Sequence, residues 1–362
     1  MPDRIYLDHA ATTPVRPEAV RATAEAMARW ANPSSPHGEG RAARRELEDT
    51  RAAIASAYGW TGSVLLTSGA SEALAIALGR AQVERRAINA VEHDAVFRAA
   101  DDAEVLPVGA DGLLSTQALD AFLAQPGRAL VAAQWANSET GVRQPIAAIA
   151  DRVHAARHLL LVDAAQMPAG ADPDVMAHAD FVAVCAHKRG GPPGVGALLV
   201  RDLGALAPTG GQEFGYRAGT ENAPAAAGYA AALKLPEPIE RWTALRERLD
   251  DAVRRSDGQV VGDGSPRHPA VGAYRMPGTA SAAQLIRFDL AGFAVSAGSA
   301  CASGSMKPSH VLAALGWTEK AGREVVRVSF GRDTSEEEIE AFIIAWRRIA
   351  RETRSVLGNF AA

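Results

Sequence analysis

The chain has 362 residues, of which 48% are hydrophobic and 22% charged, as in ordinary folded proteins and unlike disordered ones. The 38 lysines and arginines against 42 aspartates and glutamates give a net charge of −4, which argues against direct binding of nucleic acid. No apolar run approaches the ~20 residues that span a bilayer, and the N-terminal residues do not resemble a signal peptide. Two cysteines, Cys185 and Cys301, favour a reducing compartment, so we expect a soluble cytoplasmic protein without disulfides.

The first two thirds of the chain alternate between helical and strand-like segments. We expect helices over residues 16–30, 38–58 and 71–80, and strands over 64–67, 87–91, 104–108, 130–134, 159–162, 181–184 and 197–200. These strand segments are short and continuously apolar, which is typical of parallel strands that are buried on both faces. The pattern therefore predicts an α/β fold with a mostly parallel sheet covered by helices.

The composition changes at residues 235–238, where the sequence Leu-Pro-Glu-Pro indicates a hinge. A charged helix is expected from 239 to 255, and an amphipathic helix over 335–354 ends the chain. We predict a large α/β domain over 15–235. The remaining residues, 1–14 and 236–362, are expected to form a smaller α+β domain.

An aspartate and a lysine follow two of the predicted strands. Asp163 comes directly after the apolar run 159–162, and Lys188 follows the run 181–184. Ligands of parallel sheets bind beyond the carboxyl ends of the strands, so we expect both side chains at the same edge. Such a pair suits pyridoxal phosphate (PLP), whose aldehyde needs an amine and whose pyridinium nitrogen needs a carboxylate. A surface salt bridge is the alternative interpretation.

Two further segments lie at the same predicted edge. Residues 67–72 (TSGASE) end a strand and open a helix, whose first amides and Ser71 hydroxyl can hold a phosphate. A simple capping box formed by Ser68 with Ser71 and Glu72 is the alternative for this segment. His93 follows the strand 87–91 and places a titratable ring at the same edge, although a lone histidine is often structural.

Ten segments in order resemble motifs of the cysteine desulfurases in the class V aminotransferase superfamily, and they cover nearly the whole chain. They are YLDHAATTP (6–14), NPSSPHGEGR (32–41), TSGASEA (67–73), EHDAV (92–96), ANSETGVRQPI (136–146), VDAAQ (162–166), AHKRGGPPGVGAL (186–198), GGQEFGYRAGTEN (210–222), SAGSACASGSMKPSHVLAALG (296–316) and VRVSFGRDTSEEEI (326–339). The resemblance implies a PLP-dependent transferase of fold type I.

The resemblance also implies a set of cofactor contacts and no metal. The residues that it assigns to PLP are Ala70, Ser71, His93, Asn137, Asp163, Gln166, Cys185, His187, Lys188 and Thr220. Lys188 resembles the Schiff-base lysine and Asp163 the partner of the pyridine nitrogen. Asn137 and Gln166 resemble contacts to the phenolic oxygen, and His93 resembles a histidine that stacks on the ring and transfers protons.

The remaining assignments concern the phosphate, the substrate and a second subunit. Ala70, Ser71 and His187 resemble the residues that hold the phosphate. Thr220 resembles a phosphate contact that reaches over from the other subunit, which implies a homodimer. Arg327, with Asn137, is assigned to the carboxylate of L-cysteine, a task that guanidinium geometry suits.

The two cysteines are expected to differ in role. Cys301 lies among small residues between Gly298 and Gly304, which is typical of a mobile loop and not of a packed core. It resembles the nucleophilic cysteine of the family, which the small domain would carry. Cys185 ends an apolar strand, so it is expected to pack beside the cofactor, where the family usually has a phosphate-binding serine. The sequence also departs from the family at His9 and Ser138, where asparagine is usual.

The expected reaction converts L-cysteine into L-alanine and leaves a persulfide on Cys301, with Lys188 and His93 as proton carriers. A sulfur-acceptor protein is expected as a partner, for iron–sulfur cluster assembly or tRNA thiolation. A selenocysteine lyase or another class V PLP enzyme on the same scaffold is the first alternative. A non-catalytic sulfur-carrier subunit is the second.

Overall fold

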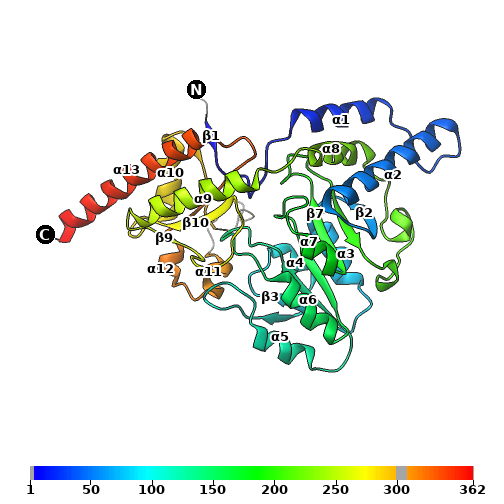
Figure 1. The fold of residues 1–362 in the computed structure, drawn as a ribbon, viewed down its shortest axis with the longest axis horizontal. Helices are drawn as coiled ribbons and strands as arrows, with labels where there is room; N and C mark the ends of the chain where they lie inside the picture. Colours follow the sequence, from blue (N-terminus) through cyan, green and yellow to red (C-terminus); the bar gives the residue numbers. More distant parts are fainter. Residues whose placement is uncertain (1–3, 299–307, 362) are drawn as a thin grey trace.

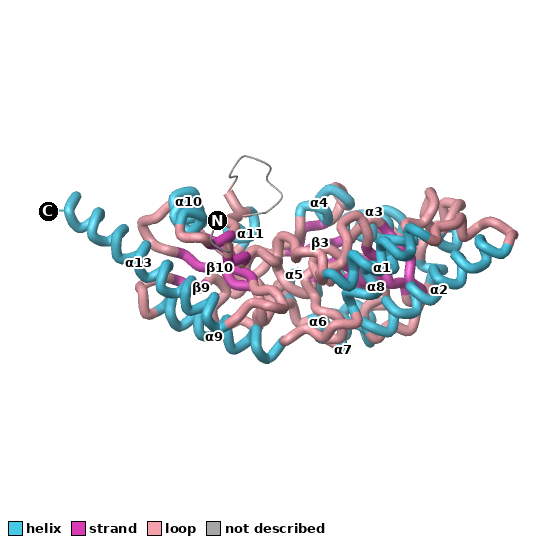
Figure 2. Tube along the Cα trace, turned by 90° about the horizontal axis from the view of Figure 1, so that it is seen from above, coloured by secondary structure: helices cyan, strands magenta, loops and turns pink. Residues whose placement is uncertain are grey.

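The structure, a computed structural model, describes residues 4–298 and 308–361 of the chain. Figure 1 shows two groups of elements side by side: one holds the elements from α1 to α8, and the other holds the chain's first strand and those from α9 onward. Figure 2 shows the last helix leading away from the larger group. None of the helices in these ranges is long and apolar enough to cross a membrane.

Within the described residues, the larger group is built on a seven-stranded sheet in the order β2-β8-β7-β6-β5-β3-β4. Its strands are β2 (Ser63–Thr67), β3 (Arg85–Asn89), β4 (Glu104–Leu106), β5 (Ala129–Gln134), β6 (Leu159–Asp163), β7 (Phe181–Cys185) and β8 (Gly196–Val200). Neighbouring strands run parallel except at β8, which is antiparallel to both β2 and β7. The prediction of a mostly parallel sheet is confirmed.

Helices cover both faces of this sheet. They are α1 (Pro17–Ala28), α2 (Gly38–Tyr58), α3 (Ala70–Arg80), α4 (Asp94–Ala99), α5 (Thr116–Leu123), α6 (Ile146–Ala155), α7 (Pro173–His178) and α8 (Ala223–Leu233), with short 3-10 turns η1 (Leu203–Ala205) and η2 (Glu213–Gly215). Along β6, Leu160 and Val162 pack on one face with α2, α5 and α6, whereas Leu159 and Leu161 pack on the other with α3 and α4. Both faces are therefore dry, as the unalternating apolar strands require.

The smaller group has its own core and two small sheets. Its elements are β1 (Ile5–Tyr6), α9 (Ile239–Arg254), β9 (Gln259–Val260), β10 (Val271–Arg275), α10 (Ser281–Leu290), β11 (Phe293–Ala294), α11 (His310–Ala314), α12 (Glu319–Gly322), β12 (Val325–Ser329) and α13 (Glu336–Ala361). Strand β10 pairs antiparallel with β12 and β9, and β1 pairs parallel with β11. Leu7 packs in the core that Trp242, Phe288 and Trp346 form, so the N-terminal segment belongs to this core.

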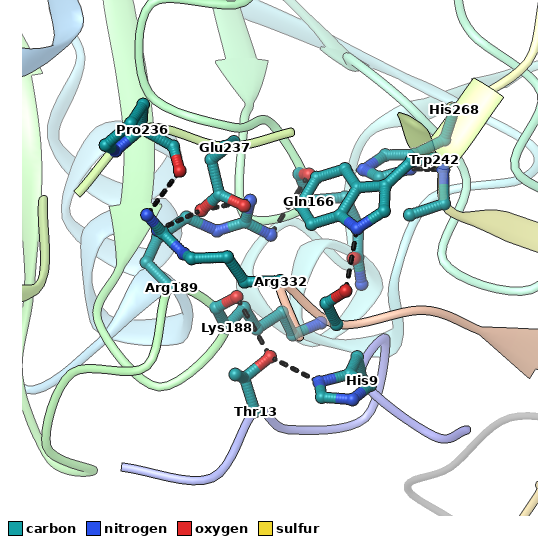
Figure 3. Close-up of polar contacts among 12 residues, drawn as sticks. His9, Thr13, Gln166, Lys188, Arg189, Pro236, Glu237, Trp242, His268 and Arg332 are labelled. Atoms are coloured by element: carbon teal, nitrogen blue, oxygen red, sulfur yellow. Dashed lines mark hydrogen bonds and ion pairs between the residues drawn. The ribbon is translucent and has the colours of Figure 1, made fainter. Parts of the chain in front are cut away.

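A buried polar network joins the two groups (Figure 3). Glu237 forms ion pairs with Arg189, at 3.5 Å, and with Arg332, at 3.1 Å. Nearby, Nε2 of His268 lies 2.9 Å from the carbonyl oxygen of Gln166. Because Arg189 directly follows Lys188, these contacts anchor the loop that carries the candidate lysine.

Candidate active site

A cavity of about 410 Å³ lies beyond the carboxyl ends of β3, β5, β6 and β7. This is the position at which a parallel sheet binds its ligand. Most side chains that the sequence assigns to the site line this cavity, namely Ala70, Ser71, His93, Asn137, Asp163, Gln166, Cys185, His187, Lys188 and Arg327. Thr220 is exposed and is not part of the lining. Cys301 lies outside the described residues.

Asp163 and Lys188 occupy the ends of neighbouring strands. Asp163 is the last residue of β6 and pairs in register with Ala183 of β7, and Lys188 follows β7 by three residues. Oδ1 of Asp163 accepts a hydrogen bond of 2.9 Å from the amide of Ala165. Burial lowers the pKa of Lys188, and the positive charge of Arg327 acts in the same direction. The site therefore favours the neutral, nucleophilic amine at Lys188.

The N-terminus of α3 opens onto the cavity through a glycine turn. Gly69, the residue before the helix, has a φ of 148°, which side chains other than glycine rarely adopt. A Cβ on Gly196 would come within 2.7 Å of the Cα of Gly69, so β8 can approach this turn closely only because residue 196 is glycine. No side chain caps the N-cap position of this helix. Its first amides can therefore bind an anion at the positive end of the helix.

The polar side chains around this turn are partly explained by capping. Glu72 accepts a hydrogen bond of 2.5 Å from the amide of Ser68 and one of 2.9 Å from Nε of Arg217, so part of the capping-box alternative is realised. Ser71 remains exposed on the cavity wall. Burial and the charge of Lys188 lower the pKa of His187 to about 4, so this ring is neutral at pH 7.

His93 stands immediately before α4. Its Nδ1 accepts a hydrogen bond of 3.1 Å from the amide of Ala95, which leaves the proton of the neutral ring on Nε2. Burial lowers the pKa of His93, and Lys188 contributes in the same direction, so the neutral ring is favoured. This ring can accept a further proton only at Nδ1, which would give up the hydrogen bond from the amide of Ala95.

The two amide side chains of the cavity are held by backbone groups. Nδ2 of Asn137 donates to the carbonyl oxygen of Val91 at 2.9 Å, and Oδ1 of Asn137 accepts from the following turn. Nε2 of Gln166 donates to the carbonyl oxygen of Ala10 at 3.0 Å. Nδ2 of Asn137 also lies 3.5 Å from Oε1 of Gln134, so both of its donors have acceptors, whereas Gln166 keeps one N–H donor for a ligand.

Arg327 projects from β12 into the same cavity. Its side chain is 2% exposed, and Nη2 donates to Oδ1 of Asp8 at 2.7 Å. Nη1 donates to the carbonyl oxygen of Ser138 at 3.1 Å. Nε of Arg327 is buried and has no partner among the described residues. A buried cation with an unused donor beside a cavity is suited to binding an anionic group.

Cys185 behaves as expected for a packed cysteine. It is 2% exposed at the end of β7, and burial raises the pKa of its thiol. The thiolate is the nucleophilic form, so the structure makes Cys185 a poor nucleophile. It still lines the cavity, where its Sγ lies 4.0 Å from the carbonyl oxygen of Ala165.

Sequence reasoning missed two acidic residues of this region, Asp8 and Glu92. Glu92 is 1% exposed, its Oε1 accepts from the amide of Gln134 at 2.7 Å, and its Oε2 has no partner among the described residues. Burial raises the pKa of Glu92 well above its usual value, and repulsion from Asp163 adds to the effect. Both acids stand inside motifs quoted above, but no spacing rule distinguishes them from solvated carboxylates.

The residues present fit pyridoxal phosphate. Lys188 can hold its aldehyde carbon, Asp163 can face its pyridine nitrogen, and the uncapped start of α3 can take its phosphate. No cluster of metal-ligating side chains occurs in the ranges 4–298 and 308–361.

Comparison with known proteins agrees with this geometry. The family model for aminotransferase class V matches residues 5–342. A cysteine desulfurase of Cereibacter sphaeroides is 36% identical, with 98% of this chain and 97% of that protein covered. The IscS-like cysteine desulfurase of Mycobacterium tuberculosis is also 36% identical, with 99% of each chain covered. The crystal structure of a NifS-like protein from Rickettsia africae superposes with a TM-score of 0.85 at 30% identity, and 96% of this chain and 99% of that chain are covered.

These matches extend over nearly the full length of the chain, and the residues that the resemblance assigns to the cofactor line one cavity, except Thr220. The chain belongs to the aminotransferase class V family, a family of PLP-dependent enzymes, and within it to the cysteine desulfurases.

Proposed function

We propose that this protein is a PLP-dependent cysteine desulfurase that converts L-cysteine into L-alanine and transfers the sulfur to Cys301. The observation that carries the proposal is the convergence of Lys188, Asp163 and the start of α3 on the cavity that Arg327 enters. The names of the similar proteins support the same activity. A solved structure named SspA in complex with cysteine, with a TM-score of 0.76 and 26% identity over 91% of this chain, supports L-cysteine as the ligand.

The residues of the cavity divide substrate binding, cofactor binding and proton transfer among them. Arg327 binds the carboxylate of L-cysteine, which holds Cα of the substrate near Lys188. Lys188 accepts and returns the Cα proton through Nζ, and its lowered pKa favours the neutral amine that this step needs. Bound PLP supplies an electron sink for the charge left at Cα, and Asp163 supports it by holding the pyridine nitrogen protonated. Ala70, Ser71 and His187 hold the phosphate, and Asn137 and Gln166 contact the phenolic oxygen.

The sulfur leaves through a thiol. The Cys301 thiolate attacks the substrate sulfur, so an S–S bond forms, the Cβ–S bond of the substrate breaks, and Cβ gains a proton. The products are L-alanine and a Cys301 persulfide, and no external oxidant or reductant is needed. His93, with its neutral ring, is the proton acceptor for the thiol, and its Nδ1 takes the proton in exchange for the hydrogen bond from the amide of Ala95. The persulfide then passes to an acceptor protein.

We further propose a homodimer in which Thr220 completes the partner's phosphate site. Thr220 is exposed and stands apart from the cavity of its own chain. Three exposed apolar side chains on or beside α1 support an interface, namely Val20, Met27 and Trp30, which are 53%, 64% and 51% exposed.

We place the large domain at 15–235 and the small domain at 1–14 with 236–362. The separate cores of the two groups support this boundary.

The experiment is a visible absorption spectrum of the purified protein, followed by assays of alanine and sulfide after addition of L-cysteine with a reductant. Equal amounts of the two products are expected. Cys301→Ala should keep the cofactor absorbance and lose sulfide release, whereas Lys188→Ala should lose both. Lys234→Ala, which removes an exposed lysine, is the matched control and should keep both. A different result would indicate a selenocysteine lyase instead. In that case wild type and Cys301→Ala would both be inactive with L-cysteine, and Cys301→Ala would be fully active with L-selenocysteine.

A further inference from the structure

The carboxylate of Asp8 joins three separate segments at the edge of the cavity. Its Oδ1 accepts a hydrogen bond of 2.7 Å from Nη2 of Arg327, and its Oδ2 accepts one of 2.7 Å from Oγ of Ser296. Asp8 follows β1, Ser296 follows β11, and Arg327 lies on β12. Two backbone hydrogen bonds, of 2.6 and 3.2 Å, also connect Ser296 directly to Arg327. The carboxylate is thus held at both oxygens, with its side chain only 18% exposed.

The contacts of Arg327 leave part of its guanidinium free. Asp8 and the carbonyl oxygen of Ser138 accept from Nη2 and Nη1, and Nε is buried without a partner in the described part of the chain. An arginine side chain carries more N–H donors than these two contacts use. Because Arg327 lines the cavity, its remaining N–H donors are suited to an acceptor that enters there.

We infer that Asp8 is a positioning residue that holds Arg327 in the orientation that binds the substrate carboxylate. The inference rests on the carboxylate-binding role proposed above for Arg327. A free arginine side chain loses rotamer freedom when it binds an anion, and a partner that orients it beforehand removes part of that cost. Asp8 takes one hydrogen bond from Nη2 and leaves further N–H donors of the guanidinium for the ligand. If Asp8 instead competed with the substrate for Arg327, its removal would strengthen substrate binding.

The test uses the cofactor-loaded enzyme with Asp8→Asn, which keeps the shape of the side chain and removes its charge. We expect KM for L-cysteine to rise about tenfold with kcat changed less than about twofold, as for the loss of one charge-assisted hydrogen bond. The dissociation constant of L-alanine, read from the visible spectrum without turnover, should rise by the same factor. Asp120→Asn is the matched control, because Asp120 pairs with Arg152 at 2.6 Å in an exposed ion pair on α5. It should leave all three quantities unchanged.

A double-mutant cycle with Arg327→Ala separates positioning from a general structural effect. In the Arg327→Ala background, Asp8→Asn should change KM and the L-alanine dissociation constant less than about twofold. Asp8→Glu, which keeps the charge but lengthens the side chain, should fall between wild type and Asp8→Asn, and it serves if Asp8→Asn does not fold.

Three outcomes would overturn the inference. The first is an unchanged or lower KM in Asp8→Asn. The second is a rise in KM on Asp8→Asn that is equally large in the wild-type and Arg327→Ala backgrounds. The third is a fall in kcat alone. If Arg327→Ala itself left KM unchanged, the carboxylate role of Arg327 would fail as well, whereas a raised KM in Arg327→Ala with none in Asp8→Asn would overturn only the role of Asp8.

Discussion

Gly331 packs directly against the imidazole of His9, so closely that a Cβ on Gly331 would overlap atoms of the ring. The same ring meets Tyr6 edge to face, with centroids 4.9 Å apart. Its Nδ1 lies 3.2 Å from Oγ1 of Thr13 (Figure 3). The missing side chain at position 331 provides room for the ring of His9. The contact fixes the N-terminal segment against the loop that follows β12.

Gly331→Ala should lower the free energy of unfolding by about 1–3 kcal/mol, because the new methyl group would overpack a ring that is held on two other sides. Urea unfolding monitored by far-UV circular dichroism measures the change. His9→Ala should restore most of the loss when added to Gly331→Ala. Gly38→Ala is the control, since a Cβ there meets nothing within 4 Å and should be neutral or stabilising. If Gly331→Ala and the double variant lost the same free energy of unfolding, the proposed contact would be contradicted.

Three histidines make the fold sensitive to acid. Burial lowers the pKa of His268 to about 3 and those of His9 and His187 to about 4, against an ordinary value of 6.5. The unfolded chain binds more protons between pH 6.5 and these values, so stability is full above pH 6.5 and falls as the pH drops through this window. For fully buried His268 the slope is at most about 1.4 kcal/mol per pH unit.

His268→Gln should therefore flatten the pH dependence of unfolding between pH 6.5 and 4, while it lowers stability at pH 7 through lost packing. Urea unfolding at half-unit pH steps provides the measurement. His178→Gln, at a half-buried histidine that ends α7, should leave the slope unchanged. An undiminished slope in His268→Gln would show that His268 does not carry this acid sensitivity.

Glu92→Gln is expected to stabilise the cofactor-free protein at pH 8. Burial raises the pKa of Glu92 well above 4.5, and the charge of Asp163 adds to this, so the folded chain holds a proton that the unfolded chain releases. The contribution of Glu92 to stability thus falls as the pH rises above 4.5. Glutamine is the neutral isostere, and its advantage should be roughly 1–3 kcal/mol at pH 8 and shrink toward pH 5.

Thermal and urea unfolding of the apoprotein at pH 5 and 8 measure this difference. Glu104→Gln, at an exposed position on β4, is the matched control and should show no pH-dependent gain. A Glu92→Gln protein that is less stable than wild type at both pH values would indicate that the charged form is the one the fold requires.

Lys188→Met should make the apoprotein more stable at pH 7, because burial lowers the pKa of the Lys188 amine below 10.5. The unfolded chain then binds more protons than the folded one below pH 10.5, so the stability of the wild-type apoprotein rises with pH. The advantage of Lys188→Met should narrow as the pH approaches 10. Urea unfolding at pH 7 and pH 9.5 tests this, with exposed Lys234→Met as the control. If the stability difference between Lys188→Met and wild type were the same at pH 7 and pH 9.5, the prediction would be contradicted.

Local sequence patterns were sufficient to predict the sheet and the position of the cavity. The apolar runs of β5, β6 and β7 can be buried only as strands covered on both faces, and Asp163 and Lys188 follow two of them directly. Helix α2 was predicted over residues 38–58 and spans Gly38–Tyr58, because Gly59 in the left-handed conformation ends it. The chemistry of the site could also be predicted from local sequence, because side chains at the strand ends of one parallel sheet gather at one edge.

The strand order and the partners of Arg327 depend on the tertiary structure. Strand β8 runs antiparallel between β2 and β7, although its sequence is as uniformly apolar as that of the parallel strands. Asp8 and Arg327 are 319 positions apart, and Glu92 meets the amide of Gln134 from another strand. Spacing along the chain reports only contacts within one helix or strand. Whether a carboxylate is solvated, paired or buried depends on which distant segments pack around it, and so does its charge at neutral pH.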